Sequence, residues 1–225
     1  MRGLVLLSGG LDSATCLEYA VSHCGAENVV ALTICYGQRH DRELRSARAV
    51  AQHYGVRHIE LDLTEVFRGA ECTLLRDSQE DVPEGSYADQ KQTENGVSTY
   101  VPFRNGVFLS ICAAVALKEK CGVVFYGIHR DDVAGNAYPD CTKAFHENMA
   151  RAINEGTGYK VNVIAPFING TKADIVAYGK KAGVPYELTW SCYKGGEKPC
   201  GKCATCIDRA KAFAANNMED KLWNF

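Results

Sequence analysis

Short apolar runs alternate with amphipathic stretches along most of the chain. The apolar runs at residues 4–7, 29–36 and 56–63 predict strands, and the last of these alternates apolar with polar positions. Between them, residues 13–23 and 41–54 carry apolar side chains at helical spacing. This order of strand, helix, strand, helix, strand is typical of a parallel sheet covered by helices.

The second half continues the pattern with two more strands and three more helices, expected at residues 123–128 and 161–165 and at residues 107–118, 142–154 and 171–182. The last helix opens with Thr171, and Asp174 follows in a capping-box pattern. We predict a Rossmann-like α/β domain over residues 1–187, with a parallel sheet and helices on both faces. A small C-terminal module is expected over residues 188–225.

A polar segment rich in Gln, Glu, Ser and Gly interrupts this rhythm at about residues 75–99. Loops of this length inside a compact domain are usually active-site lids or disordered segments. We predict a lid, with plain disorder as the alternative.

Charge and composition narrow the function. The 225 residues have a formal net charge of -2, and no basic run indicates a nucleic-acid-binding surface. Residues 39–48 are dense in charge but mixed in sign, which favours a solvated helix face. No stretch reaches the roughly 18 apolar residues of a membrane span, and the first residues lack a secretory pattern. We expect a cytoplasmic protein without nucleic-acid or membrane partners.

The first expected strand leads directly into Ser8-Gly9-Gly10-Leu11-Asp12-Ser13. Paired glycines let several backbone N–H groups approach one anion, and the start of a helix adds partial positive charge. The segment lacks the lysine of a Walker loop, so transfer of a γ-phosphate is not indicated. The pattern predicts a phosphate-binding loop, and an ordinary strand-to-helix turn is the alternative.

Four of the eleven cysteines crowd into fifteen residues, at Cys192, Cys200, Cys203 and Cys206. The other seven are scattered among apolar residues, where a free thiol behaves as a small hydrophobe. Four thiolates at this spacing fit a closed tetrahedral zinc site. An iron–sulfur cluster is the alternative, but its motif usually continues with a further cysteine and a proline.

Three more motifs lie beside the expected sheet edge or metal site. Tyr138-Pro139-Asp140-Cys141 follows the strand at residues 123–128, and ligands bind at the carboxyl ends of such strands. Residues 101–105 open a helix and present Arg104, which can clamp an anion. Residues 188–193 run into the first cysteine of the metal site.

The loop at residues 8–13 matches the pyrophosphatase loop of the N-type ATP pyrophosphatases, which include GMP synthetase, asparagine synthetase and tRNA lysidine synthetase. Together with residues 36–40, residues 171–174, the three middle motifs and the four cysteines, it makes the chain resemble the 7-cyano-7-deazaguanine synthase (QueC) family from Leu4 to about Phe213. The segment before Tyr138 is a little longer than in some members.

This resemblance implies an adenine nucleotide alpha hydrolase-like fold and an ATP-dependent carbon–nitrogen ligase. The family converts 7-carboxy-7-deazaguanine and ammonia to 7-cyano-7-deazaguanine (preQ0) for queuosine biosynthesis. The substrate carboxylate is adenylated, ammonia displaces AMP, and a second activation with loss of water gives the nitrile. The loop type implies release of AMP, with ADP as the alternative. Mg²⁺, Zn²⁺ and a homodimer are also implied, and ammonia comes from solution or from a partner.

The resemblance also suggests roles for individual residues. The ATP site would be Leu7, Ser8, Gly9, Gly10, Leu11, Asp12 and Ser13. Asp12 would hold Mg²⁺ or orient the phosphates, and the catalytic set would be Ser8, Asp12, Arg104 and Lys172. A capped surface helix is the alternative reading of Lys172.

A carboxylate can accept both the ring N–H and the exocyclic amine of a guanine-like ring. Asp140 is the first choice for this contact and Asp132 the second, although Asp140 also suits a turn after Pro139. The other substrate-binding candidates are Tyr138 as a stacking face, Arg104 and Gln38. His40 is either a general acid or base or a structural residue. Cys141 is not expected to be a nucleophile, because adenylation already activates the substrate.

Other functions also fit parts of this sequence. A lysidine-forming ligase or a thiolase acting on tRNA belongs to the same superfamily, but the acidic balance and the absence of extra length argue against both. A family member that attaches a deazaguanine to another acceptor is a further alternative. A non-catalytic zinc module is disfavoured by the intact loop.

Overall fold

The computed structural model describes residues 1–86, 97–132 and 138–223. Within these residues, five parallel strands form one sheet in the order β3-β2-β1-β4-β5. The strands are β1 (Gly3–Leu6), β2 (Val29–Cys35), β3 (Arg57–Asp62), β4 (Val123–Phe125) and β5 (Asn162–Ile164). This sheet order agrees with the predicted Rossmann-like class.

Strand β1 lies at the centre of the sheet. Leu4 is paired with Val30 of β2 on one side and with Val124 of β4 on the other, and all three side chains are fully buried. A strand that is covered on both faces needs apolar residues at every position, which explains the continuous apolar runs. The edge strand β3 has polar residues at alternate positions, as the sequence predicted.

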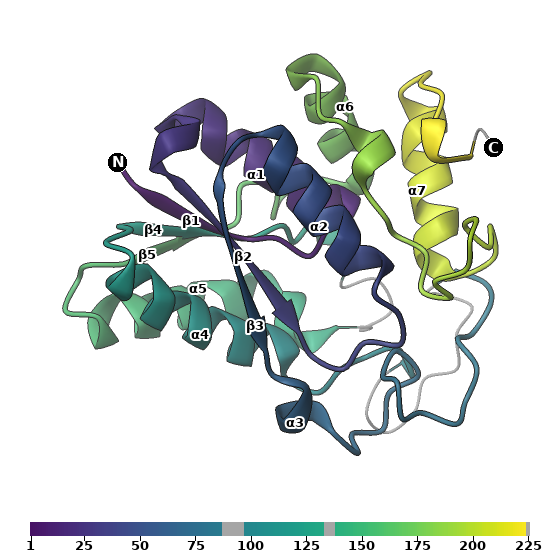
Figure 1. Cartoon of the computed structure of the whole chain (residues 1–225), viewed down its shortest axis with the longest axis horizontal. Coiled ribbons are helices and arrows are strands. Elements are labelled where there is room, and N and C mark those ends of the chain that lie inside the picture. The colour runs from purple at the N-terminus through teal and green to yellow at the C-terminus, as the bar shows by residue number, and fades with distance from the viewer. Residues whose placement is uncertain (87–96, 133–137, 224–225) are drawn as a thin grey trace.

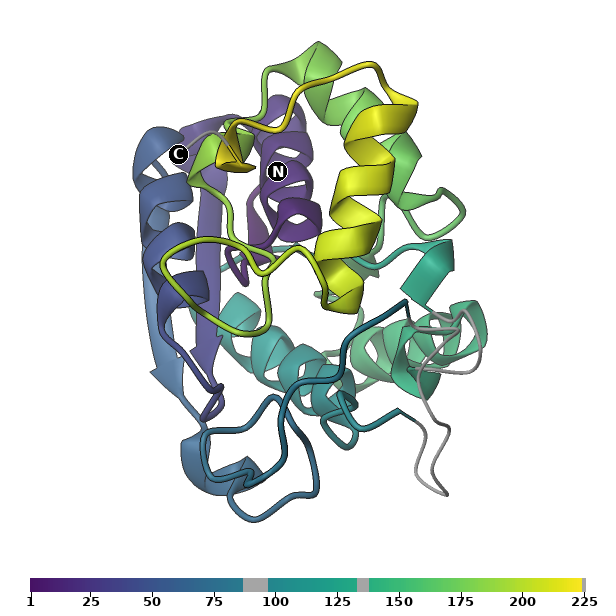
Figure 2. The same cartoon turned by 90° about the vertical axis from the view of Figure 1, so that its right-hand side faces the viewer.

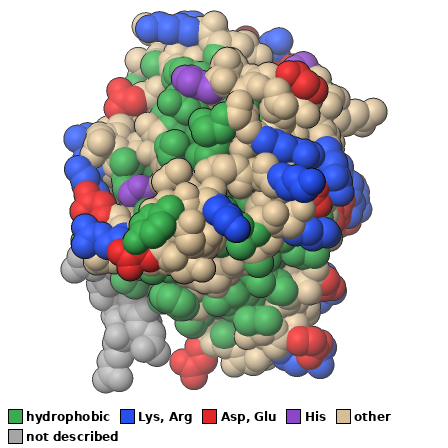
Figure 3. All heavy atoms as spheres, turned by 90° about the vertical axis from the view of Figure 1, so that its left-hand side faces the viewer, with side chains coloured by type: hydrophobic (Ala, Val, Ile, Leu, Met, Phe, Trp, Pro, Cys, Tyr) green, Lys and Arg blue, Asp and Glu red, His purple; other side chains and the backbone are tan. Residues whose placement is uncertain are grey.

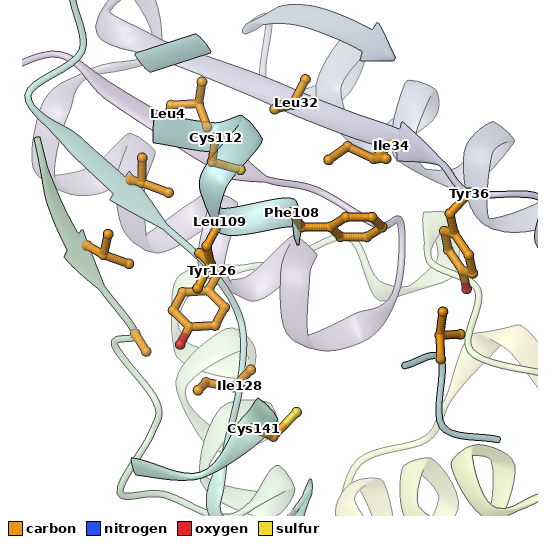
Figure 4. Close-up of a cluster of buried hydrophobic side chains, with 14 of the residues drawn as sticks. Leu4, Leu32, Ile34, Tyr36, Phe108, Leu109, Cys112, Tyr126, Ile128 and Cys141 are labelled. Carbon is orange, nitrogen blue, oxygen red and sulfur yellow. The ribbon is translucent and has the colours of Figure 1, made fainter. Parts of the chain in front are cut away.

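Helices cover both faces of the sheet (Figure 1). One face carries α1 (Leu11–Cys24), α2 (Arg42–His53) and α6 (Lys172–Ala182), and the other carries α4 (Arg104–Lys118) and α5 (Lys143–Gly156). Figure 4 shows the core between the sheet and α4, where Phe108, Leu109 and Cys112 of α4 pack toward Leu4 and Leu32 of the sheet. A short helix, α3 (Thr64–Phe67), follows β3.

Two helices begin earlier than the hydrophobic periodicity predicted, although the motif at residues 101–105 did indicate the start of the second. Helix α1 starts at Leu11, directly after the glycine pair. Helix α4 starts at Arg104 because the Asp140 carboxylate accepts the backbone N–H of Asn105 at 2.8 Å and satisfies the first turn. Hydrophobic periodicity could not predict this start, since the capping group comes from a distant part of the chain.

The capping box at α6 is confirmed. The Thr171 hydroxyl accepts the N–H of Asp174 at 3.2 Å, and the Asp174 carboxylate accepts the N–H of Thr171 at 2.8 Å.

The polar segment at residues 75–99 is partly described. Leu75, Val82 and Val97 are buried, and the N–H of Gly85 donates to the carbonyl of Lys202 in the cysteine-rich region at 2.9 Å. The two ends of the segment therefore pack against the domain. Residues 87–96, on which the lid prediction mainly falls, lie outside the described residues.

The C-terminal helix α7 (Ala204–Ala215) packs against α6 (Figures 1 and 2). Arg209 on α7 is only 1% exposed, and its guanidinium binds the buried Asp220 carboxylate at 2.9 Å. The same group donates to the Thr189 hydroxyl at 2.7 Å and to the Tyr186 carbonyl at 3.0 Å. Arg209 thus fixes the terminal helix to the segment that leads into the cysteines.

Figure 3 shows the face that lies on the left in Figure 1, where the N-terminus leads into β1. Positive and negative side chains are both present there, as the balanced composition predicts. Among the described residues, no helix combines the length and apolarity that crossing a membrane requires.

Replacing Arg209 with Met should lower the free energy of unfolding by roughly 3–5 kcal/mol, because the Asp220 carboxylate would stay buried without its partner. Urea denaturation measures this change. The control Arg45→Met breaks an exposed i,i+4 ion pair with Asp41 and should leave the midpoint nearly unchanged. Equal midpoints for the two variants would contradict the buried-pair interpretation.

Candidate active site

A cavity of about 190 Å³ opens where β1, β2 and β4 end. The chain passes from β1 to β2 on one side and later to β4 on the other, so this is the point where the strand order reverses. Open parallel sheets bind ligands in the crevice that such a reversal creates. The lining includes many of the predicted site residues, among them Ser8, Gln38, Arg104, Asp132, Tyr138 and Lys172.

The glycine-rich loop forms one wall of this cavity. Gly9 has φ +91°, and a Cβ atom there would lie 2.1 Å from the backbone oxygen of Glu43 on α2. The backbone N–H groups of Ser8 and Gly9 both point at the Ser13 hydroxyl, at 3.2 Å each. Loop amides converge on one oxygen at the start of a helix, which is the arrangement that a phosphate oxygen needs.

Four charged or titratable side chains meet beside the loop. Lys172 Nζ lies 3.4 Å from Asp12 Oδ2, and His129 Nε2 lies 3.7 Å from Asp12 Oδ1 and 3.3 Å from Asp132 Oδ1. His129 Nδ1 accepts the N–H of Asp131 at 3.2 Å, so a neutral imidazole carries its proton on Nε2, facing the two carboxylates. The four groups come from α1, α6 and the loop after β4.

Mutual attraction keeps most of this cluster charged. Burial alone would raise the pKa of Asp12, but Lys172 and His129 hold it well below its usual range. Burial would lower the pKa of Lys172 and of His129, and the facing carboxylates raise both instead. Burial raises the pKa of Asp132. Within the described residues, the buried atoms Asp12 Oδ1 and His129 Nε2 have no hydrogen-bond partner, which suits a site for a ligand.

Arg104 lies on the opposite wall. Its guanidinium is 5.4 Å from the centre of the Tyr36 ring, and Nη1 donates to the Tyr36 hydroxyl at 3.4 Å. Glu43 lines the same cavity. Arg104 is therefore a half-buried cation in the cavity lining, and its role in orienting an anionic group stays a prediction.

Asp140 and Asp132 are placed differently from each other. Asp140 is buried and not part of the cavity lining, and its carboxylate caps α4 through Asn105. Asp132, the second choice, lines the cavity. Cys141 also lines it, 3.1 Å from the Asn105 amide nitrogen, and burial raises the pKa of its thiol well above the usual value. A protonated thiol agrees with the expectation that Cys141 is not a nucleophile.

Tyr138, Gln38 and His40 complete the predicted set. The Tyr138 hydroxyl lies 2.9 Å from that of Thr99, and the Gln38 side-chain oxygen accepts the N–H of Tyr36 at 2.9 Å. His40 does not line the cavity, and a Cβ atom on Gly195 would lie 2.2 Å from its ring. This tight packing against the cysteine-rich segment favours the structural role for His40.

The four clustered cysteines converge. Their Sγ atoms all lie within 4.8 Å of one another. The N–H of Cys200 donates to Cys192 Sγ at 3.3 Å, and the N–H of Cys203 donates to Cys200 Sγ at 3.3 Å. Gly201 provides the left-handed turn between them, with φ +73°. Convergent thiols whose charge is stabilised by amides fit a four-thiolate metal site such as zinc.

Trp190 connects the cysteine cluster to the glycine-rich loop. Its backbone N–H donates to the Gly9 carbonyl at 3.0 Å, and its indole N–H donates to the Cys192 carbonyl at 2.8 Å. The segment that holds the first cysteine therefore supports the loop from behind.

Comparisons with known proteins agree with this geometry. A model of the family described as "Queuosine biosynthesis protein QueC" matches residues 2–217. The chain belongs to the QueC family. A 7-cyano-7-deazaguanine synthase from Archaeoglobus fulgidus is 43% identical over 223 residues, covering 99% of this chain and 90% of its own. Another from Caldicellulosiruptor saccharolyticus is 41% identical over 222 residues, covering 99% and 95%.

The fold has a likeness in a solved structure outside the family. NMN synthetase from Francisella tularensis superposes with a TM-score of 0.53 at 13% identity, covering 97% of this chain and 78% of that one. At this identity the likeness concerns the fold, and it supports the predicted Rossmann-like class.

Two residues at or beside the cavity of this QueC protein were not predicted, since His129 contacts its lining aspartates and Glu43 lines it. His129 lies directly after the strand expected at residues 123–128, beside two aspartates, and that position at the sheet edge was the available signal. Glu43 belongs to the charged segment that was interpreted as a solvated helix face, and its side chain lines the cavity instead. That interpretation was wrong for Glu43, because only the docking of α2 on the loop turns this position inward.

Replacing Gly9 with Ala should lower the free energy of unfolding by about 1–3 kcal/mol more than Gly55→Ala does, because only the methyl group added at position 9 must displace α2. Both glycines have positive φ, but a Cβ atom on Gly55 would meet nothing within 4 Å. Urea denaturation of the two variants measures the difference, and calorimetry should show weaker pyrophosphate binding for G9A alone. Matching losses of stability would show that α2 does not pack tightly on the loop.

Proposed function

We propose that this QueC-family protein is an ATP-dependent ligase that converts 7-carboxy-7-deazaguanine and ammonia to 7-cyano-7-deazaguanine. One observation carries the proposal. The loop amides and the Asp12–Lys172 pair lie together at one cavity, where the strand order of the sheet reverses. The names of the relatives, at 38–43% identity, supply the product, 7-cyano-7-deazaguanine.

The loop and its neighbours would bind ATP as a substrate. The amides and hydroxyls of residues 8–13 hold the phosphates that leave as pyrophosphate, and Lys172 balances their charge beside Asp12. Asp12 would hold Mg²⁺ through its unpartnered oxygen, and the ion would neutralise phosphate charge. Arg104 orients the substrate carboxylate toward the α-phosphorus from the opposite wall.

The chemistry then proceeds in two activations. A carboxylate oxygen attacks the α-phosphorus, and pyrophosphate leaves. Ammonia attacks the acyl carbon, and AMP departs with the carboxylate oxygen while one proton is lost. The amide oxygen attacks the α-phosphorus of a second ATP, and pyrophosphate leaves again. AMP then departs with that oxygen, and loss of both N–H protons yields the nitrile. Release of AMP is proposed from the loop type.

The remaining predicted residues fit around the reacting group. Tyr138 offers an aromatic face, and Gln38 offers an amide at the end of β2. Asp132 lines the cavity, whereas Asp140 does not, and Asp132 faces His129 there. A thiolase would need a pair of cysteines here, and among the described residues Cys141 alone lines the cavity.

The finer properties belong to the same proposal. We propose zinc in the cysteine cluster rather than an iron–sulfur cluster, because Ile207-Asp208-Arg209 follows Cys206 where the ferredoxin motif has a further cysteine and a proline. The module at residues 188–225 then stabilises the loop of the domain at residues 1–187 through Trp190. A cytoplasmic homodimer that uses free ammonia, without nucleic-acid or membrane partners, completes the proposal.

The purified protein should form a product of the nitrile's mass from 7-carboxy-7-deazaguanine, ammonium and Mg-ATP. Asp12→Ala should reduce turnover by at least about a hundredfold without unfolding the protein, since it removes charge stabilisation at the phosphates. Mass spectrometry measures the product and its loss in the variant, and thermal melting shows whether the variant is folded. ATP consumption that does not depend on the deazaguanine would sink the proposal.

Elemental analysis should find about one zinc per chain and no inorganic sulfide. Cys203→Ser should lower the zinc content strongly, because a structural site needs all four thiolates. Cys35→Ser, outside the cluster, is the matched control and should keep the metal. Iron together with sulfide in the wild-type protein would overturn the zinc assignment.

A further inference from the structure

Glu43 is a cavity-lining carboxylate for which the adenylation chemistry has no use. It is the second residue of α2, and the docking of its backbone against Gly9 fixes its position beside the loop. Within the described residues, no hydrogen bond and no ion pair within 4 Å engages its carboxylate. A carboxylate without a partner in a cavity wall lowers the stability of the fold unless a ligand donates hydrogen bonds to it.

The other carboxylates at this sheet edge already have neighbours. Asp12 faces Lys172 and His129, Asp132 faces His129, and Asp140 caps α4 outside the cavity. Among the described carboxylates that line the cavity, Glu43 is thus the one that can accept hydrogen bonds from a ligand without losing a protein partner.

The surroundings of Glu43 suit a flat ring that carries an anionic group. Tyr36, Phe108 and Trp190 line the same cavity and offer aromatic faces. Arg104 supplies a cation, and its charge is felt at both Glu43 and Tyr36. A ring between these walls can direct an acidic substituent to Arg104 and its opposite edge to Glu43.

We propose that Glu43 determines base specificity by accepting the ring N–H and the exocyclic amine of a guanine-type ring. A guanine-type edge presents two donors side by side, and an ionised carboxylate offers acceptors only. An adenine-type edge presents one donor and one acceptor, so the ionised group repels its ring nitrogen. This inference rests on the proposed function and names the residue that selects its substrate.

Protonation of Glu43 reverses this preference, because a carboxylic acid offers one donor and one acceptor. Burial raises the pKa of Glu43 to about 7, and the charge of Arg104 opposes this rise. Arg104 and Tyr36 do not change charge near pH 7. Arg104 stays protonated, and burial raises the pKa of the Tyr36 phenol further above its usual value. Affinity for a guanine-type ligand should therefore fall as the pH drops through about 7, which is where Glu43 gains its proton.

The test is equilibrium binding by calorimetry, without turnover. The ligands are 7-carboxy-7-deazaguanine, its analogue without the 2-amino group, and ATP. The proteins are wild type, Glu43→Gln, Glu43→Asp and the control Glu65→Gln, which alters an exposed glutamate on α3. Thermal melting confirms that each variant folds.

Wild type and E65Q should prefer the 2-amino compound over its analogue by roughly tenfold to a hundredfold, as hydrogen bonds to a charged group do. E43Q should lose that preference and the pH step at about 7, with ATP affinity unchanged, and E43D should keep part of the preference. Equal weakening of both deazapurines by E43Q would show a merely structural role.

Two further outcomes would overturn the inference. If E43Q weakens ATP binding and leaves the deazaguanine unaffected, Glu43 serves the nucleotide. If wild type fails to bind 7-carboxy-7-deazaguanine at any pH, the proposed function fails with it, whereas normal wild-type binding with an unchanged E43Q overturns the role of Glu43 alone.

Discussion

The site depends on the close packing of Gly9 against the backbone of α2. Strand β1 is hydrogen-bonded to β2 and β4, so its end is fixed between two neighbours. The chain must then turn into α1 within a few residues while α2 presses on it, and only a glycine fits at that contact. This constraint holds the loop amides together around one oxygen, and it also carries Glu43 to the cavity wall. The proposed phosphate site and the proposed base-recognition residue thus depend on one steric contact.

Charge in the cavity is divided between two walls. On the loop side, Lys172 and His129 keep the pKa of Asp12 low despite its burial, so the carboxylate is available as an anion. On the far side, Arg104 stands over Tyr36, while Glu43 stays beside the loop, where α2 packs on Gly9. The Asp12 cluster suits phosphates and a cation, whereas Arg104 suits the acidic group of a flat ring. Two substrates can therefore be oriented toward each other by opposite sets of charges.

The cysteine-rich segment is coupled to this arrangement through a few hydrogen bonds. Trp190 donates to Gly9 from its backbone and to Cys192 from its indole ring, and Arg209 ties the preceding segment to α7. A metal that fixes the four thiolates would thereby stiffen the back of the phosphate loop. A site closed by four protein thiolates leaves no open position for a substrate, which agrees with a structural role.

The sequence alone determined the parallel α/β sheet, the glycine-rich loop, the cysteine cluster and the family, because these depend on local periodicity and on short motifs. It also indicated that residues 101–105 open a helix, but not what caps α4, since Asp140 reaches that helix from a distant segment. Only the tertiary structure decided that Asp132 lines the cavity while Asp140 does not, and that His129 and Glu43 belong to the site. The physical reason is that side-chain direction at a sheet edge is set by how helices dock on the strands, and that packing joins residues that no local pattern relates.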